Sequence, residues 1–168
     1  MKIDASALIY LAKIDFLAQV TDKYQPIKIT QSIYDEVVTQ GKKKGFSDAF
    51  IIDNFIDKGK ITIEKDDAEF PSNLANLDVG EISAIVSVLK TKELLIIDDI
   101  KARNRAKDLE VDFLGTDGLL LDSFISNYID YDFFEKKIYF LANLLLLKSS
   151  KVMKLLKQAK NLKKRKKE

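Results

Sequence analysis

Acidic residues follow two short apolar runs of this sequence, at positions where strands should end and helices begin. Asp4 follows the first run, and the adjacent acids Asp98 and Asp99 follow the run Leu94–Ile97. Two further acids, Glu36 and Glu81, lie in segments with a helical pattern. Carboxylates that are dispersed in sequence but meet at one edge of a sheet can bind a divalent cation. Such convergence would distinguish an enzyme from an ordinary globular domain.

The composition limits the kinds of catalysis and metal binding that are available, because the chain contains no histidine and no cysteine. Histidine-based acid–base catalysis, thiolate chemistry and the usual zinc sites are therefore excluded. Any metal must be held by oxygen ligands, which points to Mg²⁺ or Mn²⁺. The sequence has no apolar run of about 20 residues and no signal-peptide pattern, so we expect a cytoplasmic protein that does not bind membranes.

Short β-type runs alternate with helical patterns along the 168 residues. This order predicts an α/β fold in which helices cover both faces of a mainly parallel sheet. Gly41 is expected to end a helix, and segments 42–45 and 66–76 are expected to be loops. The predicted strands are 2–4, 27–30, 61–63, 94–97 and 111–114, and the predicted helices are 7–13, 16–23, 31–40, 47–58, 79–92, 102–109, 119–128, 132–147 and 151–162. In parallel sheets, sites lie at the carboxyl ends of the strands, which is where Asp4 and the Asp98–Asp99 pair would lie.

Basic residues are concentrated at the C-terminus. Segment 148–168 contains ten of the 28 lysines and arginines and one acid, whereas the rest of the chain has 18 basic and 25 acidic residues. We predict a main domain over residues 1–147 and a basic helix or tail over residues 148–168. The tail either attracts nucleic acid or serves as a solubilising helix.

Each acid also has an ordinary structural interpretation. Either Asp4 or Ser6 can cap the helix that follows, and Glu36 can be a solvated side chain. The spacing from Asp78 to Glu81 is that of a capping box. One member of the Asp98–Asp99 pair can cap the helix over residues 102–109, which would leave the other for a metal. Near the last strand, Thr116 is a candidate N-cap or a hydroxyl that positions the carboxylates, and Asp117 is a helix-terminal charge.

In order and spacing, five segments resemble the PIN-domain nucleases, in particular the VapC-like toxins. The resemblance covers roughly residues 1–125, and the segments are Ile3–Ile9, Ile29–Val38, Leu77–Ile85, Leu94–Arg103 and Gly115–Thr116. It implies a three-layer α/β/α sandwich with extra C-terminal helices and a catalytic domain over residues 1–147. Asp117, segment 119–130 and the lysine-rich end depart from the family pattern.

The resemblance also implies a metal-dependent endoribonuclease, with Mg²⁺ or Mn²⁺ as cofactor. Its catalytic acids would be Asp4, Glu36, Glu81 and Asp99, and its metal ligands would be Asp4 and Glu81 together with Asp98 or Asp99; of the adjacent pair, Asp99 is favoured. RNA would be the substrate, a cognate antitoxin the partner and a homodimer the assembly.

Several basic residues are candidates for contacts to the RNA backbone: Lys42, Lys43, Lys44, Lys101, Arg103, Arg105 and the terminal lysines. A non-catalytic module for binding protein or nucleic acid is the alternative to a nuclease. A receiver-like phosphoacceptor is less suitable, because its paired acids would follow the first strand rather than a late one.

Overall fold

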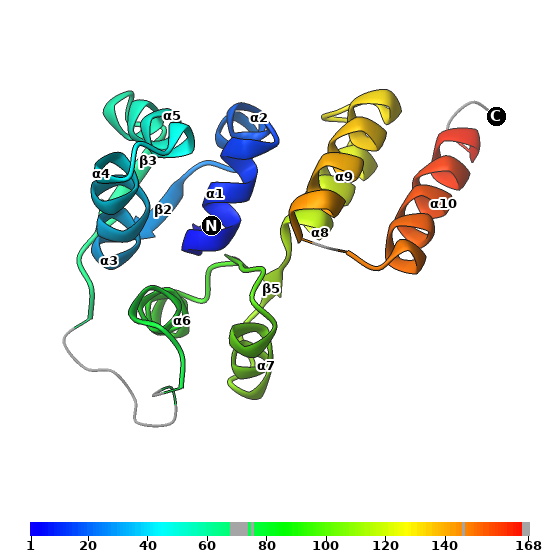
Figure 1. The fold of residues 1–168 in the computed structure, drawn as a ribbon. Coiled ribbons are helices and arrows are strands. Elements are labelled where there is room, and N and C mark those ends of the chain that lie inside the picture. The colour runs from blue at the N-terminus through cyan, green and yellow to red at the C-terminus, as the bar shows by residue number, and fades with distance from the viewer. Residues whose placement is uncertain (68–73, 75, 146, 166–168) are drawn as a thin grey trace. The chain divides into compact units, whose positions relative to one another are not determined.

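A five-stranded parallel sheet forms the centre of the first compact unit, residues 1–115, in the computed structural model (Figure 1). The strands lie in the order β3-β2-β1-β4-β5. All are short, and the three inner strands are largely buried, as is usual when helices cover both faces of a parallel sheet. Their bounds are β1 (Lys2–Ile3), β2 (Ile27–Thr30), β3 (Ile61–Glu64), β4 (Leu95–Ile96) and β5 (Phe113–Leu114).

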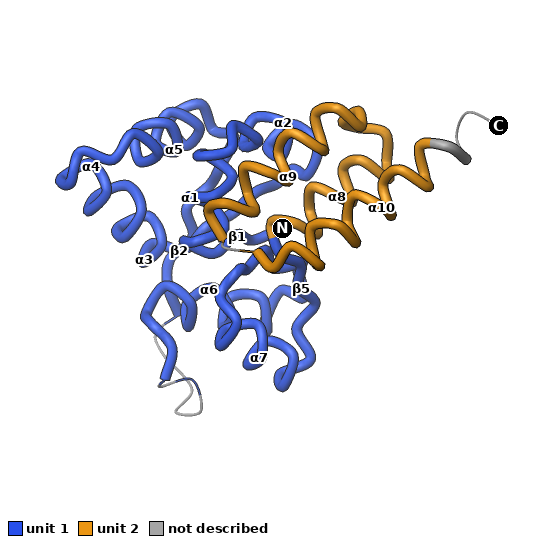
Figure 2. Tube along the Cα trace, turned by 45° about the vertical axis from the view of Figure 1, so that its right-hand side comes forward, with its two compact units in different colours: residues 1–115 blue, residues 116–168 orange. Residues whose placement is uncertain are grey.

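Helices cover both faces of this sheet, which confirms the predicted α/β/α layering. Helices α1 (Ala5–Lys13), α2 (Leu17–Lys23) and α5 (Ser47–Asp57) lie on one side, and α6 (Val79–Thr91) and α7 (Ile100–Asp108) lie on the other (Figures 1 and 2). The chain runs from β1 outwards to β3 and then returns past β1 to β4 and β5. Because parallel connections are right-handed, this reversal moves the helices to the opposite face. The topological switch point therefore lies between β1 and β4.

The apolar periodicity of α1 places it against the sheet. Ala7, Leu8, Leu11 and Ala12 form a buried stripe, whereas Tyr10 is half-buried and Lys13 is exposed. Spacings of three and four residues bring side chains to one face of a helix. One face of α1 thus belongs to the core, and the face that carries Tyr10 and Lys13 is left for another role.

The helix predicted over residues 31–40 continues to residue 43 as α3 (Gln31–Tyr34), the π-helix η1 (Asp35–Gln40) and α4 (Gly41–Lys43). The prediction that Gly41 ends this helix is wrong, since Gly41 has right-handed helical dihedral angles. A Cβ atom on Gly41 would lie 2.7 Å from the Cβ atom of Ala49. This glycine therefore allows α4 and α5 to pack closely. Lys42, predicted to lie in a loop, is in α4 and forms an ion pair with Asp53.

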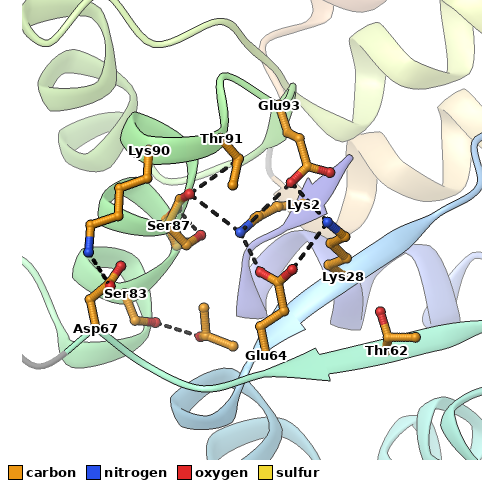
Figure 3. Close-up of polar contacts among 12 residues, drawn as sticks. Lys2, Lys28, Thr62, Glu64, Asp67, Ser83, Ser87, Lys90, Thr91 and Glu93 are labelled. Carbon is orange, nitrogen blue, oxygen red and sulfur yellow. Dashed lines mark hydrogen bonds and ion pairs between the residues drawn. The ribbon is translucent and has the colours of Figure 1, made fainter.

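Charged side chains from β1, β2, β3 and the segment just before β4 form a network on the side of the sheet where α6 lies (Figure 3). The ammonium group of Lys2, a residue only 3% exposed, forms an ion pair with Glu64 and lies 3.4 Å from the carbonyl oxygen of Ser87. Lys28, the register partner of Lys2, lies 3.2 Å from Glu64 and 3.3 Å from Glu93. Since each carboxylate contacts both lysines, the network compensates the buried charge of Lys2.

Residues 116–168 form a second compact unit, made of α8 (Thr116–Ile125), α9 (Tyr131–Leu145) and α10 (Ser149–Arg165). Its core includes Phe124 and Phe134, whose ring centroids lie 5.5 Å apart. In α10, the apolar residues Val152, Leu155 and Ala159 are buried and lie on one face of the helix. The two compact units divide after Gly115, and the functional boundary at residues 147/148 stays a prediction.

The start of α8 differs from the prediction, because α8 begins at Thr116 rather than at residue 119. Thr116 is fully buried as the first residue of α8. Asp117 is also buried, and one of its oxygens lies 2.6 Å from the ammonium group of Lys151. Asp117 is therefore a charge partner for α10 in addition to lying in the first turn of α8.

The structure describes residues 1–67, 74, 76–145 and 147–165, with side chains described up to residue 163. Pro71 in the predicted loop 66–76 and the terminal Lys166 and Lys167 lie outside the described residues. Among the helices that are described, none has both the length and the apolar character needed to cross a membrane.

Candidate active site

The switch point brings the first and the late acidic positions to neighbouring strand ends. The backbone N–H of Asp4, just after β1, donates a hydrogen bond to the carbonyl oxygen of Ile96 at the end of β4, over 2.9 Å. Asp98 and Asp99 follow two and three residues later. Ligand sites of open parallel sheets form in this crevice.

Asp4 is the N-cap of α1, and Ser6 is its partner. The Oδ2 atom of Asp4 accepts hydrogen bonds from the Ser6 hydroxyl over 2.7 Å and from the Ser6 backbone N–H over 3.3 Å. The Oδ1 atom is buried and has no hydrogen-bond partner among the described residues. Burial raises the pKa of Asp4 to about 6, although the bond from Ser6 opposes this. A buried carboxylate oxygen without a partner is costly, so Asp4 is suited to a cation.

Glu36 reaches the same region from the π-helix η1. A Cβ atom built on Gly80 would lie 2.8 Å from the Oε2 atom of Glu36, so the missing side chain of Gly80 makes room for this carboxylate. Burial raises the pKa of Glu36, the nearby charge of Asp78 raises it further, and Lys44 opposes both. A π-helical turn shifts the direction of the side chains that follow it and often marks functional positions.

Asp78 and Glu81 form the predicted capping box at the start of α6. The backbone N–H of Glu81 donates to Oδ1 of Asp78 over 2.8 Å, and that of Asp78 donates to Oε2 of Glu81 over 3.1 Å. Burial is the main cause that raises the pKa of Glu81 to about 7, and the charges of Asp78, Asp99 and Asp4 add to it. Glu81 therefore takes part in the capping box and still lies close enough to the strand-end acids for their charges to raise its pKa.

One pocket of about 280 Å³ collects these side chains. Its lining includes three of the predicted catalytic acids, Asp4, Glu36 and Glu81, and also Asp78. The other lining residues come from the first residues of the chain and α1: Ala5, Ser6, Ile9, Tyr10 and Lys13. Four carboxylates from three segments distant in sequence thus share one cavity.

The adjacent acids after β4 have different partners. Oδ1 of Asp99 accepts the backbone N–H of Ala102 over 2.9 Å and caps α7. Asp98 is buried, and its Oδ1 atom lies 2.6 Å from the guanidinium of Arg103, which also donates to the carbonyl oxygen of Ile97. The cap is therefore Asp99, while Asp98 is held by an arginine. Which of the two binds metal stays a prediction.

The donor set fits a hard divalent cation in its chemistry. It consists of carboxylate oxygens, and one of them, Oδ1 of Asp4, is buried without a partner among the described residues. Across the described ranges, no group of three or more acidic side chains is already gathered as closely as a metal site requires. One oxygen of Glu81 accepts a hydrogen bond in the capping box of α6, and one oxygen of Asp99 accepts a hydrogen bond at the start of α7.

Sequence patterns alone did not identify every residue that lines the pocket. The sequence pattern predicts only a capping role for Asp78 and indicates no role for Tyr10 and Lys13. The spacing of four and then three residues from Ser6 to Tyr10 to Lys13 was the available signal, since it places all three on one helix face. Gly80 offered no signal, because its function depends on a side chain 44 positions earlier.

A parallel α/β sandwich with an acidic pocket at its switch point is an architecture that supports metal and phosphate chemistry. The family model described as PIN domain (DUF3368) matches residues 2–161. The chain therefore belongs to the PIN domain family. This membership confirms the resemblance at the level of the family, and PIN domains are in general nucleases that use divalent metal ions.

A solved structure supports the same relationship. A PilT N-terminus domain protein from the hyperthermophilic archaeon Sulfolobus solfataricus P2 is 27% identical, with a TM-score of 0.54. The match covers 73% of this chain and 91% of that protein. None of the curated proteins matches this chain.

Proposed function

We propose that this protein is a metal-dependent endoribonuclease that hydrolyses RNA phosphodiester bonds. The observation that carries the proposal is the pocket in which Asp4, Glu36 and Glu81 meet, in a chain of the PIN domain family. Asp4 is the central residue, because its buried Oδ1 atom has no partner among the described residues.

Asp4, Glu81 and one of the acids Asp98 and Asp99 would hold Mg²⁺ or Mn²⁺. When bound, such an ion neutralises phosphate charge and lowers the pKa of water. Hydrolysis transfers a water oxygen to phosphorus and breaks the bond to the leaving oxygen, which takes up a proton.

The remaining residues would orient the reactants. Glu36, whose Oε2 atom lies where a side chain on Gly80 would be, would accept a hydrogen bond from the attacking water. Ser6 fixes Asp4 through its hydroxyl, and Arg103 fixes Asp98. Asp78 adds negative charge near Glu36 and Glu81, which favours a bound cation.

Asp4→Asn and Asp99→Asn test this proposal on RNA in the presence of Mg²⁺ or Mn²⁺. Both variants are expected to lose metal-dependent cleavage while their circular dichroism spectra remain those of the wild type. Asp22→Asn is the matched control, because Asp22 is exposed and pairs with Lys60 outside the pocket. Undiminished cleavage by both pocket variants would contradict the assignment.

A non-catalytic binding module is the second candidate. It is favoured by the separation of the carboxylates, which form no ready group of three across the described residues. Isothermal titration with Mn²⁺ distinguishes the two functions. A nuclease should bind the ion with loss of affinity in Asp4→Asn, whereas a module should show no binding.

We further propose that the protein is the toxin of a toxin–antitoxin pair, acts as a homodimer and works in the cytoplasm. Support for a partner comes from α9, where Tyr139 and Phe140 are 52% and 54% exposed while Phe134 is buried in the core. Exposed apolar groups of this kind occur at protein interfaces. Growth arrest on expression, relieved by a gene adjacent to this one, tests the pairing. Light scattering tests the dimer, and a monomer at all concentrations would contradict it.

A further inference from the structure

The acidic pocket also has lining residues that are not carboxylates and that have no part in the function proposed above. Tyr10 and Lys13 line it together with Asp4, Glu36, Asp78 and Glu81. Both residues lie on the face of α1 opposite the buried stripe of Ala7, Leu8, Leu11 and Ala12. Their exposure therefore results from the helical period and is not a failure of core packing.

The aromatic side chain of Tyr10 lies in polar surroundings. Tyr10 is half-buried, and burial together with the charges of Asp98 and Asp4 raises the pKa of its phenol. The hydroxyl therefore stays protonated at neutral pH, and the phenol lies near enough to Asp98 and Asp4 for their charges to act on it. The half-buried side chain of Tyr10 thus lines the pocket near the strand-end acids.

Lys13 is exposed and, among the described residues, forms no ion pair although it lines a cavity with four carboxylates. Other lysines of this unit, such as Lys2, Lys28 and Lys42, are paired with acids. A cavity that repels a polyanion needs a cation nearby to bind the phosphate next to the reacting one. Lys13 lies one helical turn from Tyr10, so a base and an adjacent phosphate can contact the two side chains together.

We propose that Tyr10 and Lys13 bind the substrate beside the carboxylates, with the Tyr10 ring stacked on a nucleobase and the Lys13 ammonium on a flanking phosphate. This inference rests on the proposed nuclease function and adds to it two residues that position the RNA. Stacking on an aromatic ring is available only to an unpaired base and tolerates any base, because every base has a π-face. The pair would therefore favour a locally unpaired strand without reading its sequence.

Binding is measured separately from cleavage, by fluorescence anisotropy with a labelled phosphorothioate oligoadenylate in Mg²⁺, a probe that resists hydrolysis because Mg²⁺ binds sulfur poorly. Tyr10→Leu should weaken binding roughly 5- to 150-fold, the range for loss of one base–aromatic stack. Tyr10→Phe keeps the ring and should bind like the wild type. An abasic probe should bind the wild type and Tyr10→Leu equally, because it has no base to stack.

Lys13→Ala should reduce the slope of log affinity against log salt by about 0.7, the value for one phosphate contact on a single strand. Lys13→Arg should restore the slope. Lys58→Ala is the matched control, since Lys58 is an exposed lysine at the end of α5 and does not line the pocket.

Three results would overturn the inference: no binding of the probe by the wild type, unchanged binding in both Tyr10→Leu and Lys13→Ala, or a loss in Tyr10→Phe equal to that in Tyr10→Leu. The last result would assign the role to the hydroxyl rather than to the ring. If the wild type binds the probe with the expected variant pattern but cleaves no RNA in Mg²⁺ or Mn²⁺, the inference stands and the nuclease function fails.

Discussion

The space that a side chain on Gly80 would need is taken by the carboxylate of Glu36, whose Oε2 atom would lie 2.8 Å from a Cβ at that position. Gly80 lies in the first turn of α6 and Glu36 in the π-helix η1. The two segments are far apart in sequence, so this contact fixes how one catalytic candidate approaches the pocket. A glycine in a helix normally costs stability, and here it leaves room for the carboxylate of Glu36.

Gly80→Ala is therefore expected to displace Glu36 without unfolding the protein. Alanine is a better helix former than glycine by up to ~1 kcal/mol, so the free energy of unfolding should stay within about 1 kcal/mol of the wild type. Metal-dependent kcat/KM should fall on the order of 10²-fold, because displacements of about 1 Å have that effect on catalysis. Denaturant titration and cleavage kinetics measure the two quantities.

Gly41→Ala is the contrasting variant. Its new Cβ atom would meet the Cβ atom of Ala49 at 2.7 Å, in the packing between α4 and α5. It should lose stability by about 1–3 kcal/mol while the folded fraction keeps its activity. If Gly80→Ala cleaves RNA at the rate of the wild type, then Glu36 has no role in catalysis.

Without metal, the stability of the protein should fall as the pH rises. Burial raises the pKa of Asp4 to about 6 from an ordinary value of 3.8, so between these values the folded state holds a proton that the unfolded state has lost. Ionisation of Asp4 then costs roughly 3 kcal/mol of stability, fully expressed above the folded pKa. Glu81, with its pKa raised to about 7 mainly by burial, extends the decline towards higher pH.

Asp4→Asn should remove the part of this decline that falls between about pH 4 and pH 6, measured by denaturant titrations in a chelator from about pH 4 to pH 8, and should leave the part that Glu81 causes at higher pH. Mn²⁺ should stabilise the wild type more at pH 8 than at pH 5, because the ion binds only ionised carboxylates. An identical pH dependence of stability in the wild type and Asp4→Asn would show that Asp4 is not a buried acid in the folded protein.

Lys2→Met should destabilise the fold while the pocket stays intact. Lys2 is almost completely buried and forms an ion pair with Glu64, so its loss leaves a partly buried carboxylate with Lys28 alone. Breaking fully buried pairs costs about 3–5 kcal/mol, and the partial exposure of Glu64 reduces the expected loss to roughly 2–3 kcal/mol.

The control for this variant is Lys60→Met, which removes an exposed pair with Asp22. Exposed pairs contribute about 0–1 kcal/mol, so this variant should unfold close to the wild type. Equal stabilities of the Lys2 and Lys60 variants would show that the network in Figure 3 does not stabilise the sheet.

The basic end of α10 should contribute to RNA binding through its charge. Deletion of residues 161–168 removes five basic residues and one acid. The shortened protein should therefore bind RNA more weakly, and its salt dependence should flatten by about 0.7 for each phosphate that the tail binds in the wild type. Replacement of the five basic residues by glutamine keeps the chain length and should have the same effect. An unchanged salt slope in both variants would leave the tail with a solubilising role only.

The order of elements could be predicted from the sequence because burial imposes a period on each of them. The apolar run at residues 94–97 predicted a central strand, and β4 is buried there. The helix predicted over residues 79–92 agrees with α6 within one residue. The helix 31–43 was predicted less well, because the residue that normally ends a helix, Gly41, is needed for packing against Ala49.

The sequence by itself determined the parallel α/β order, the choice of oxygen chemistry in a chain without histidine or cysteine, and the positions of Asp4, Asp98 and Asp99 at strand ends. These properties depend on residue type and local period. Only the tertiary structure decided that Asp78, Tyr10 and Lys13 share a pocket with Asp4, Glu36 and Glu81, that Asp99 caps α7 and that Arg103 holds Asp98. The physical reason is that a side chain's burial and partners depend on how helices from distant segments pack on the sheet, which no local pattern specifies.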